Sequence, residues 1–304
     1  MKMLRHLLGL MFVVLAAVPA EAATSTSQSE VGKTVPVGDF SVIPLLDGAH
    51  SFPLSLFKGS DEATMLAAAG TQPVPGSFNV FLIKHGKESF LVDTGNGTLR
   101  PERKGLLRLA LQKAATAPEE IDKIFITHLH GDHIGGLVEN GKPAFPKARV
   151  YVARVEYDYW LNDEAMRQTP EGRRGLFPLV RGVLRVLADN NRLVFFTPGE
   201  EVSPGIVSVP LFGHTPGHCG FMLASKNEKI FFVGDLLHAA ALQLLHPEIT
   251  ADFDVDQPLA KETRLRIFKQ IAEDKTLIAT AHLPFPGIGL VRPEGGGYRF
   301  EALK

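Results

Sequence analysis

The chain of 304 residues has a single cysteine, Cys219, and almost no net charge. One thiol excludes an internal disulfide framework and any zinc module built from several cysteines. With 32 Lys and Arg against 33 Asp and Glu, the formal charge is −1, which gives no general attraction to nucleic acid or to an anionic membrane surface. Hydrophobic residues make up 45% of the chain, enough for a sizeable core. We therefore expect a globular protein that does not bind nucleic acid.

Motifs of several large enzyme classes are also missing. The chain contains neither a Gly-x-Ser-x-Gly nucleophile elbow nor a Walker A loop. Gly95-Asn-Gly97 begins a dinucleotide-binding fingerprint, but Arg100 stands in place of its third glycine. Neither a serine nucleophile nor a nucleotide cofactor is indicated.

The N-terminus has the pattern of a secretory signal peptide over residues 1–22. Lys2 and Arg5 precede the apolar run Leu7–Val18, and an Ala-x-Ala site predicts cleavage after Ala22. The apolar run of twelve residues is shorter than the roughly 20 that a membrane-spanning helix needs, which favours export over the alternative of a membrane anchor. We expect a periplasmic or secreted protein without a stable membrane anchor, with a flexible, polar lead-in over 23–35 and one domain over 36–304.

Apolar runs bounded by Gly, Pro or Asp predict strands, and apolar residues near a 3.6-residue period predict helices. The predicted strands are Phe40–Leu46, Phe78–Ile83, Ser89–Val92, Lys123–Thr127, Arg149–Val152, Arg192–Phe196, Ile206–Leu211, Phe221–Ala224, Ile230–Val233 and Leu277–Thr280. The predicted helices are Pro101–Ala115, Arg154–Leu161, Gly172–Ala188 and Pro258–Glu273. This mixture favours an α/β sandwich with helices outside over a β-barrel or a helical bundle.

Four potential metal ligands follow one predicted strand within six residues, in the pattern His128-x-His130-x-Asp132-His133. Imidazole nitrogens and carboxylate oxygens are ligands for zinc and similar divalent ions. In extended backbone, residues two apart point the same way, so His128 and His130 can bind one ion together. Asp132 and His133 follow a glycine, where the chain can turn toward a second ion.

Two ions need further ligands, and three later segments provide them. His218, Asp235 and His282 each lie in a turn or at the end of a buried strand. His214 is expected to form hydrogen bonds within its turn instead, and His238 is a candidate for the wall of a pocket. Cys219 is expected to be a small, buried apolar residue.

This set of residues resembles the ligand set of the metallo-β-lactamase superfamily over residues 36–304. The resemblance implies a four-layer αβ/βα sandwich with two divalent ions, most often Zn²⁺. It assigns the first ion to His128, His130 and His218, the second ion to Asp132, His133 and His282, and a bridging role to Asp235. It also implies that Asp93, in Leu-Val-Asp93-Thr-Gly, orients a ligand histidine.

The tail, Ala281–Gly289 and Gly297–Phe300, together with Gly213–His218 and the segment from Asp235 to His238, resembles the methyl parathion hydrolase branch and its lactonase-like relatives. That branch implies a secreted or periplasmic homodimer that hydrolyses organophosphate triesters, aryl esters or lactones. Trp160 and Phe177 look like its aromatic cluster, but no matching phenylalanine lies in the segment 95–105. We therefore expect a lactone or carboxylic ester rather than a phosphotriester as substrate.

The resemblance thus implies hydrolysis by a hydroxide that bridges two ions. Asp235 and Asp132 are the predicted catalytic carboxylates, and a substrate pocket is predicted from Trp160, Phe177, Phe285 and His238. The main alternative is a mono-iron oxygenase that acts on thiol or persulfide compounds. A glyoxalase-type thiolester hydrolase lacks this tail, a β-lactam hydrolase usually has a cysteine in place of Asp235, and a non-enzymatic binding protein is expected to have lost ligands.

Overall fold

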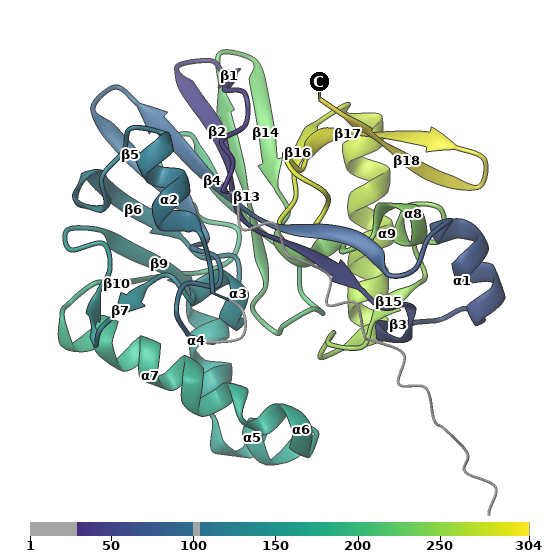
Figure 1. The fold of residues 1–304 in the computed structure, drawn as a ribbon, viewed down its shortest axis with the longest axis horizontal. Coiled ribbons are helices and arrows are strands. Elements are labelled where there is room, and N and C mark those ends of the chain that lie inside the picture. Colours follow the sequence, from purple (N-terminus) through teal and green to yellow (C-terminus); the bar gives the residue numbers. More distant parts are fainter. Residues whose placement is uncertain (1–28, 100–103, 304) are drawn as a thin grey trace, which may run out of the picture.

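The computed structural model describes residues 29–99 and 104–303. Two sheets of seven strands each face one another, and helices cover their outer faces (Figure 1). This is the predicted αβ/βα sandwich. The predicted signal peptide, residues 1–22, lies outside the described residues.

The first sheet has the order β1-β2-β4-β5-β6-β9-β10. Neighbouring strands are antiparallel from β1 to β5, and the pairs from β5 to β10 are parallel. Its strands are β1 Val35–Val37, β2 Phe40–Phe52, β4 Val74–His85, β5 Glu88–Val92, β6 Ile121–Phe125, β9 Arg149–Ala153 and β10 Leu193–Phe196.

The second sheet has the order β11-β12-β13-β14-β16-β17-β18. All of its neighbouring pairs are antiparallel except β14 with β16, which is parallel. Its strands are β11 Glu201–Ser203, β12 Ile206–Pro210, β13 Cys219–Ser225, β14 Glu228–Phe232, β16 Leu277–Ala279, β17 Ile288–Glu294 and β18 Gly297–Ala302.

Helices and short strands connect and cover the two sheets. The helices are η1 Leu54–Leu56, α1 Glu62–Ala69, α2 Leu107–Lys113, η3 Pro118–Glu120, α3 Gly131–Ile134, α4 Arg154–Leu161, α5 Asp163–Gln168, α6 Glu171–Arg174, α7 Leu176–Asp189, η4 Gly234–Leu236, α8 Ala240–Gln243 and α9 Gln257–Glu273. Two small sheets pair β3 Phe57–Lys58 with β15 Thr250–Ala251, and β7 Val138–Glu139 with β8 Lys142–Pro143.

Three hydrophobic clusters fill the spaces between the four layers. One joins the first sheet to α2 and α7, the next lies between the two sheets, and the third joins the second sheet to α9. Successive side chains of one strand enter different clusters, as Leu91 packs toward the helices while Phe90 and Val92 pack between the sheets. A strand that is buried on both faces needs an uninterrupted apolar run, which is why these strands can be recognised in the sequence.

All ten predicted strands are present, and each predicted helical stretch contains a helix. The lead-in predicted over 23–35 is described from residue 29 on, and this part contacts β2. Val31 pairs with Leu45 of β2, and the backbone N–H of Gly32 donates to the carbonyl oxygen of Pro44 over 2.9 Å. This segment therefore extends the first sheet.

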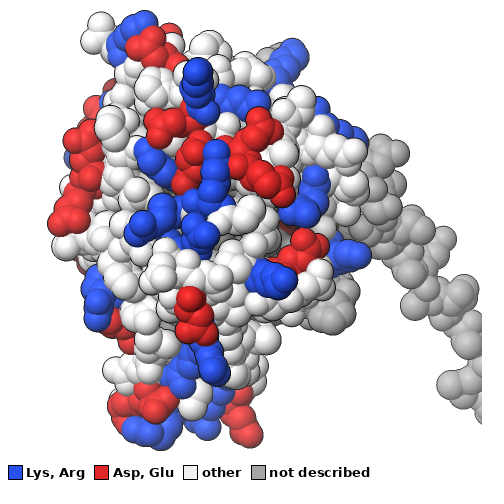
Figure 2. Space-filling view, turned by 90° about the vertical axis from the view of Figure 1, so that its left-hand side faces the viewer, with Lys and Arg blue, Asp and Glu red and all other residues white. Residues whose placement is uncertain are grey.

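Within residues 29–99 and 104–303, no helix combines the length and the hydropathy that a membrane span requires. On the face shown in Figure 2, acidic and basic side chains are interspersed.

Glycines bring two loops close together beside the strand ends. Gly97 has a φ of +52°, and a Cβ atom at this position would lie 2.0 Å from the carbonyl oxygen of Gly135. Gly135 directly follows α3. The close approach therefore packs the loop after β5 against the helix that contains Asp132 and His133.

We predict that Gly97→Ala lowers the free energy of unfolding by about 1–3 kcal/mol more than Gly141→Ala, because forced overpacking costs about that much. Gly141 is a matched control, with a φ of +73° and no atom within 4 Å of an added Cβ. Urea denaturation measures both losses. Equal losses would show that the close approach at Gly97 is unimportant.

Candidate metal centre

Polar side chains gather where parallel strands end. Asp93 follows β5, His128 and His130 follow β6, Asp235 follows β14, and His282 follows β16. The carboxyl ends of parallel strands are where α/β sheets commonly bind ligands. The two sheets thus direct these residues into one site.

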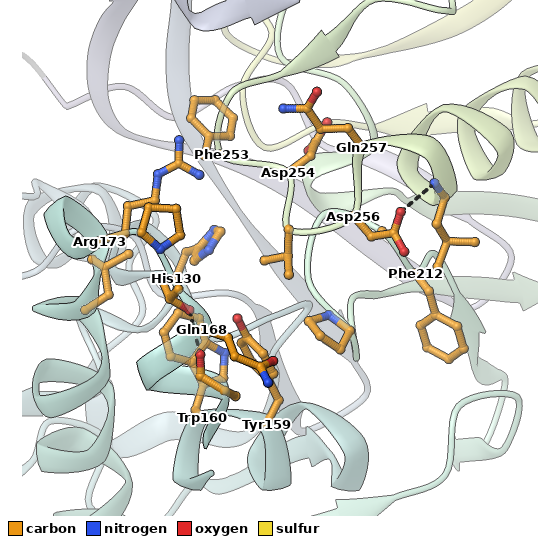
Figure 3. A pocket seen from close by; sticks show the side chains of 18 of the residues that line it. His130, Tyr159, Trp160, Gln168, Arg173, Phe212, Phe253, Asp254, Asp256 and Gln257 are labelled. Carbon is orange, nitrogen blue, oxygen red and sulfur yellow. Dashed lines mark hydrogen bonds between the residues drawn. The ribbon is translucent and has the colours of Figure 1, made fainter. Parts of the chain in front are cut away.

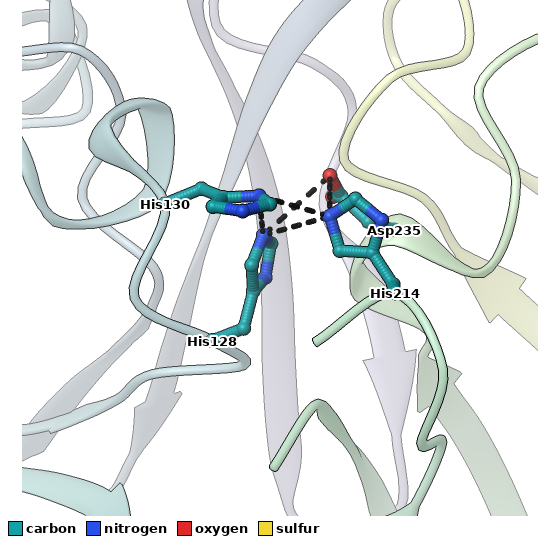
Figure 4. A group of neighbouring side chains, drawn as sticks. All are labelled: His128, His130, His214 and Asp235. Carbon is teal, nitrogen blue, oxygen red and sulfur yellow. Dashed lines mark hydrogen bonds and ion pairs between the residues drawn. The ribbon is translucent and has the colours of Figure 1, made fainter. Parts of the chain in front are cut away.

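A first group of ligands consists of His128, His130, His214 and Asp235 (Figure 4). The three facing ring nitrogens lie 2.9–3.1 Å apart. Oδ2 of Asp235 lies 3.1 Å from Nε2 of His214 and 3.6 Å from Nε2 of His128. Ligands at 2.0–2.1 Å from a tetrahedral zinc ion lie about 3.3 Å from each other. The spacing of this group therefore fits a divalent ion.

A second group consists of Asp132, His133 and His282. Nε2 of His133 and Nε2 of His282 each lie 3.0 Å from Oδ1 of Asp235. Oδ2 of Asp132 lies 3.8 Å from Nε2 of His282. Asp235 therefore directs one oxygen to each group, the arrangement that a carboxylate bridging two ions requires.

The electrostatics of the site centre on Asp235. Burial lowers the pKa of His214 and His133, but the carboxylate of Asp235 outweighs it and raises the pKa of His214 to about 9 and that of His133 well above its usual value. Burial raises the pKa of Asp235, but the nearby His133, His282 and His128 hold it well below its usual range. Burial lowers the pKa of His128 and His130, which keeps both imidazoles neutral, so each has one ring nitrogen without a proton that can bind an ion. Nε2 of His133 and Oδ1 of Asp235 are buried and form an ion pair over 3.0 Å, but neither atom makes a hydrogen bond among the described residues. Buried polar atoms of this kind call for a ligand such as a metal ion.

His214 takes the place that was predicted for His218. The ring of His218 is fully buried, but its Nδ1 donates to the carbonyl oxygen of Leu211 over 3.0 Å. Its Nε2 accepts the backbone N–H of Asp235 over 3.1 Å. Because both ring nitrogens are occupied, His218 cannot join the ligand group without losing these bonds. Burial lowers its pKa to about 3, so it stays neutral and positions the Asp235 backbone.

Buried carboxylates hold two of the ligand histidines. Oδ2 of Asp93 lies 2.8 Å from Nδ1 of His133, which is the contact that the resemblance implies for it. Oδ1 of Asp254 lies 2.8 Å from Nδ1 of His214 in the same way. A carboxylate on the far ring nitrogen fixes the orientation of a ligand histidine and raises its basicity. Asp254 has no recognisable motif around it, and sequence reasoning missed it.

Glu156, on α4, connects two loops that contain ligands. The sequence did not indicate this residue either. Its side chain is buried, with 1% exposure of the residue. Oε1 accepts the backbone N–H of Leu129 and Nε1–H of Trp160, and Oε2 accepts the hydroxyl of Thr215 and the backbone N–H of Gly217. Leu129 lies between two ligand histidines, and Thr215 follows a third. Glu156 therefore fixes the relative position of three ligands.

Two cavities adjoin the ligand groups. A cavity of about 260 Å³ is lined by ligands of both groups, by His238 and by apolar side chains. A larger cavity of about 950 Å³ is lined by Trp160 and Phe177, as predicted for the pocket (Figure 3). Nε2 of His238 lies 3.1 Å from Oδ2 of Asp235. The prediction for Phe285 is wrong, since it lines neither cavity and its ring lies beside Gly32.

A family profile described as "Metallo-beta-lactamase superfamily" matches residues 74–282, and the chain belongs to this superfamily. The fold is that of this superfamily, and the chain is a metal-dependent hydrolase with candidate metal ligands at the strand ends.

Two solved structures show the similarity over almost the whole chain. The first is "hydrolase AbOPH in beta lactamase superfamily", 31% identical, with a TM-score of 0.84, covering 89% of this chain and 97% of that one. The second is AidC, described as a dizinc quorum-quenching lactonase in complex with a product, 28% identical, with a TM-score of 0.83, covering 91% of this chain and 98% of that one.

A "Probable metallo-hydrolase" of Mycobacterium tuberculosis is 28% identical over 180 residues, which are 53% of this chain and 56% of that protein. The matched region thus spans little more than half of the length of this relative.

We predict that His214→Ala weakens zinc binding more than His218→Ala does. Loss of an outer-shell partner typically costs 10–100-fold in metal affinity, and loss of a ligand costs more. Competition titration with a zinc chelator measures both variants. A larger loss of zinc affinity in His218→Ala than in His214→Ala would show that His218 is the ligand after all.

We further predict that Glu156→Gln destabilises the protein and weakens zinc binding. The amide NH₂ of glutamine must face one of two pairs of buried donors, and each buried donor left unsatisfied costs about 1–3 kcal/mol. Thermal unfolding and zinc titration test this. Asp158→Asn is the control on the same helix, because its side chain is 54% exposed. Wild-type values in Glu156→Gln would contradict the role.

Proposed function

We propose that the protein hydrolyses lactones or carboxylic esters with two divalent ions, foremost Zn²⁺, as cofactors. The observation that carries this proposal is the geometry of Asp235, whose two carboxylate oxygens face two separate groups of ligands. The first group is His128, His130 and His214, and the second is Asp132, His133 and His282. The similarity to a dizinc lactonase supports the same reaction.

Two divalent ions, when bound, would polarise the substrate carbonyl and lower the pKa of a water molecule toward about 7. The protein's own side chains then have separate tasks. The side chain of Asp235 is 4% exposed, and its two oxygens keep the two groups of ligands in a fixed relative position. Asp132 is 26% exposed at its side chain and lines the smaller cavity, so its carboxylate can exchange protons with solvent.

The smaller cavity fits an ester or lactone group. Its wall contains the apolar side chains Phe52, Leu56, Phe78, Leu176 and Phe253 beside the ligand residues. An apolar wall excludes water from the reacting bond and strengthens the electrostatic interactions around it. A neutral substrate pays no desolvation penalty for a charge on entering this cavity.

The mono-iron oxygenase remains the alternative, and the second ligand group argues against it. One iron ion needs only the first group, whereas Asp132, His133 and His282 also converge within 4.8 Å of one another. Phosphotriester hydrolysis, secretion after removal of residues 1–22 and a homodimeric state remain proposals that rest on the resemblance to the methyl parathion hydrolase branch.

We predict that the purified protein contains two divalent ions per chain, foremost Zn²⁺, and hydrolyses a γ-lactone and an aryl ester. A phosphotriester is the third substrate in the assay. A chelator should abolish turnover and added Zn²⁺ should restore it. Asp235→Ala should lower kcat/KM more than the roughly 100-fold that loss of an outer-shell partner costs.

Elemental analysis and parallel assays make these measurements. Asp189→Ala is the control, because its carboxylate lies on the surface with 70% exposure. Full turnover in Asp235→Ala would refute the proposed function. One iron ion per chain with oxygen uptake on a persulfide would establish the oxygenase instead.

A further inference from the structure

Arg264, on α9, is a charged residue that is buried beside the metal centre although it is not a ligand. It is one of the largest fully buried side chains of the described residues, with 1% exposure. It lines neither of the two cavities. A buried charge is costly unless it is paired and hydrogen-bonded. The contacts of this guanidinium therefore indicate its role.

Three backbone carbonyl oxygens accept hydrogen bonds from Arg264. Nε donates to Leu236 over 2.8 Å, and Nη1 donates to Ile249 over 2.7 Å and to Pro247 over 3.3 Å. Leu236 directly follows Asp235 in η4, and the other two acceptors lie just before β15. The guanidinium therefore connects the turn that contains Asp235 to α9 and to the segment before β15.

The third nitrogen of the guanidinium faces Asp254. Nη2 lies 3.6 Å from Oδ2 of Asp254, and the two side chains are 1% and 0% exposed. The other carboxylate oxygen, Oδ1, lies 2.8 Å from Nδ1 of His214. Burial raises the pKa of Asp254, but His214 and Arg264 outweigh burial and lower it to about 2. A charged carboxylate thus stands between the guanidinium and a ligand of the first group.

The loop that contains His214 is also bound to the start of α9 through its backbone. The hydroxyl of Thr263 donates to the carbonyl oxygen of Phe212 over 2.8 Å. The backbone N–H of Val255 donates to the carbonyl oxygen of His214 over 3.0 Å. These bonds fix the path of the loop. The direction of the imidazole ring depends instead on the carboxylate behind it, and through that carboxylate on the guanidinium.

We propose that Arg264 is a positioning residue of the metal centre. One guanidinium fixes the turn that contains Asp235 and, through Asp254, the ring of His214. Two ligands of the first group that come from different loops thereby keep their relative position. Precise placement of ligands requires support of this kind. The inference rests on the proposed two-metal site, and Arg264 itself touches neither ion nor substrate.

The first test is Arg264→Lys, which keeps the charge but replaces the planar fork of donors by a single ammonium group. We expect it to weaken zinc binding to the first group about 10–100-fold, as is typical for loss of outer-shell support. Binding to the second group should change much less. Competition titration with a zinc chelator measures both affinities. The same titration in a His282→Ala background, which lacks a ligand of the second group, identifies the affinity of the first.

Cobalt distinguishes a positioning role from a contribution to stability alone. The visible absorption of bound Co²⁺ depends on the number and geometry of its ligands, so displaced ligands should change the spectrum of the first site in Arg264→Lys. For a γ-lactone, kcat should fall while KM stays close to the wild-type value, because Arg264 lines neither cavity.

Two other variants on α9 are controls. Arg266→Lys changes an exposed arginine two residues away and should alter neither stability nor the cobalt spectrum. Ile267→Val trims a buried side chain in the cluster between the second sheet and α9. It should lower the midpoint of thermal unfolding and leave zinc affinity and the cobalt spectrum unchanged.

Asp254→Asn tests the connection from the other side. It removes the charge between Arg264 and His214 and leaves the three carbonyl contacts of Arg264 in place. We expect weaker zinc binding to the first group. Because both residues act along one connection, the double variant should lose less affinity than the product of the two single fold-losses.

A lower unfolding midpoint in Arg264→Lys with wild-type zinc affinity and cobalt spectrum would overturn the role of Arg264 and leave the proposed function standing. If Arg264→Lys does not fold, Asp254→Asn decides, and wild-type zinc affinity in that variant would overturn the proposal. A wild-type protein that binds no divalent ion would contradict the proposed function, and this proposal with it.

Discussion

The structure depends on one buried carboxylate, that of Asp235, among histidines from both halves of the chain. A charge taken out of water is costly unless opposite charges or bound cations compensate for it. Here Oδ2 faces His128 and His214, and Oδ1 faces His133 and His282. Each sheet contributes to this cluster, so the site and the sandwich stabilise one another. Bound cations would add to this compensation, because they would be coordinated by the imidazole nitrogens as well as by the carboxylate.

A frame of further carboxylates surrounds the cluster, and each member follows a strand or precedes a helix. Asp93 comes directly after β5, Glu156 lies in the first turn of α4 after β9, and Asp254 lies between β15 and α9. Each binds a ligand histidine or the loop that carries it. Precise placement of ligands requires such support, because side chains on loops alone are too mobile to fix the position of an ion.

Much of the fold could be predicted from the sequence because strands buried on both faces need continuous apolar runs. The His-x-His-x-Asp-His motif was visible because its ligands are local. The sequence could not show that His214 rather than His218 is the ligand, because both lie in one turn-rich loop. Which ring faces the cluster depends on Asp254, 40 residues away, and on Glu156, 59 residues from Thr215. Contacts of that range leave no local periodicity in the sequence.

Anomalous diffraction at the zinc edge, from crystals grown with Zn²⁺, would locate the ions themselves. We expect two anomalous peaks about 3.5–4 Å apart, the separation typical of two-metal hydrolases, with Asp235 between them. The peak beside His128 and His130 should be coordinated by His214, with the ring of His218 behind it. A single peak, or a peak coordinated by His218, would contradict the account.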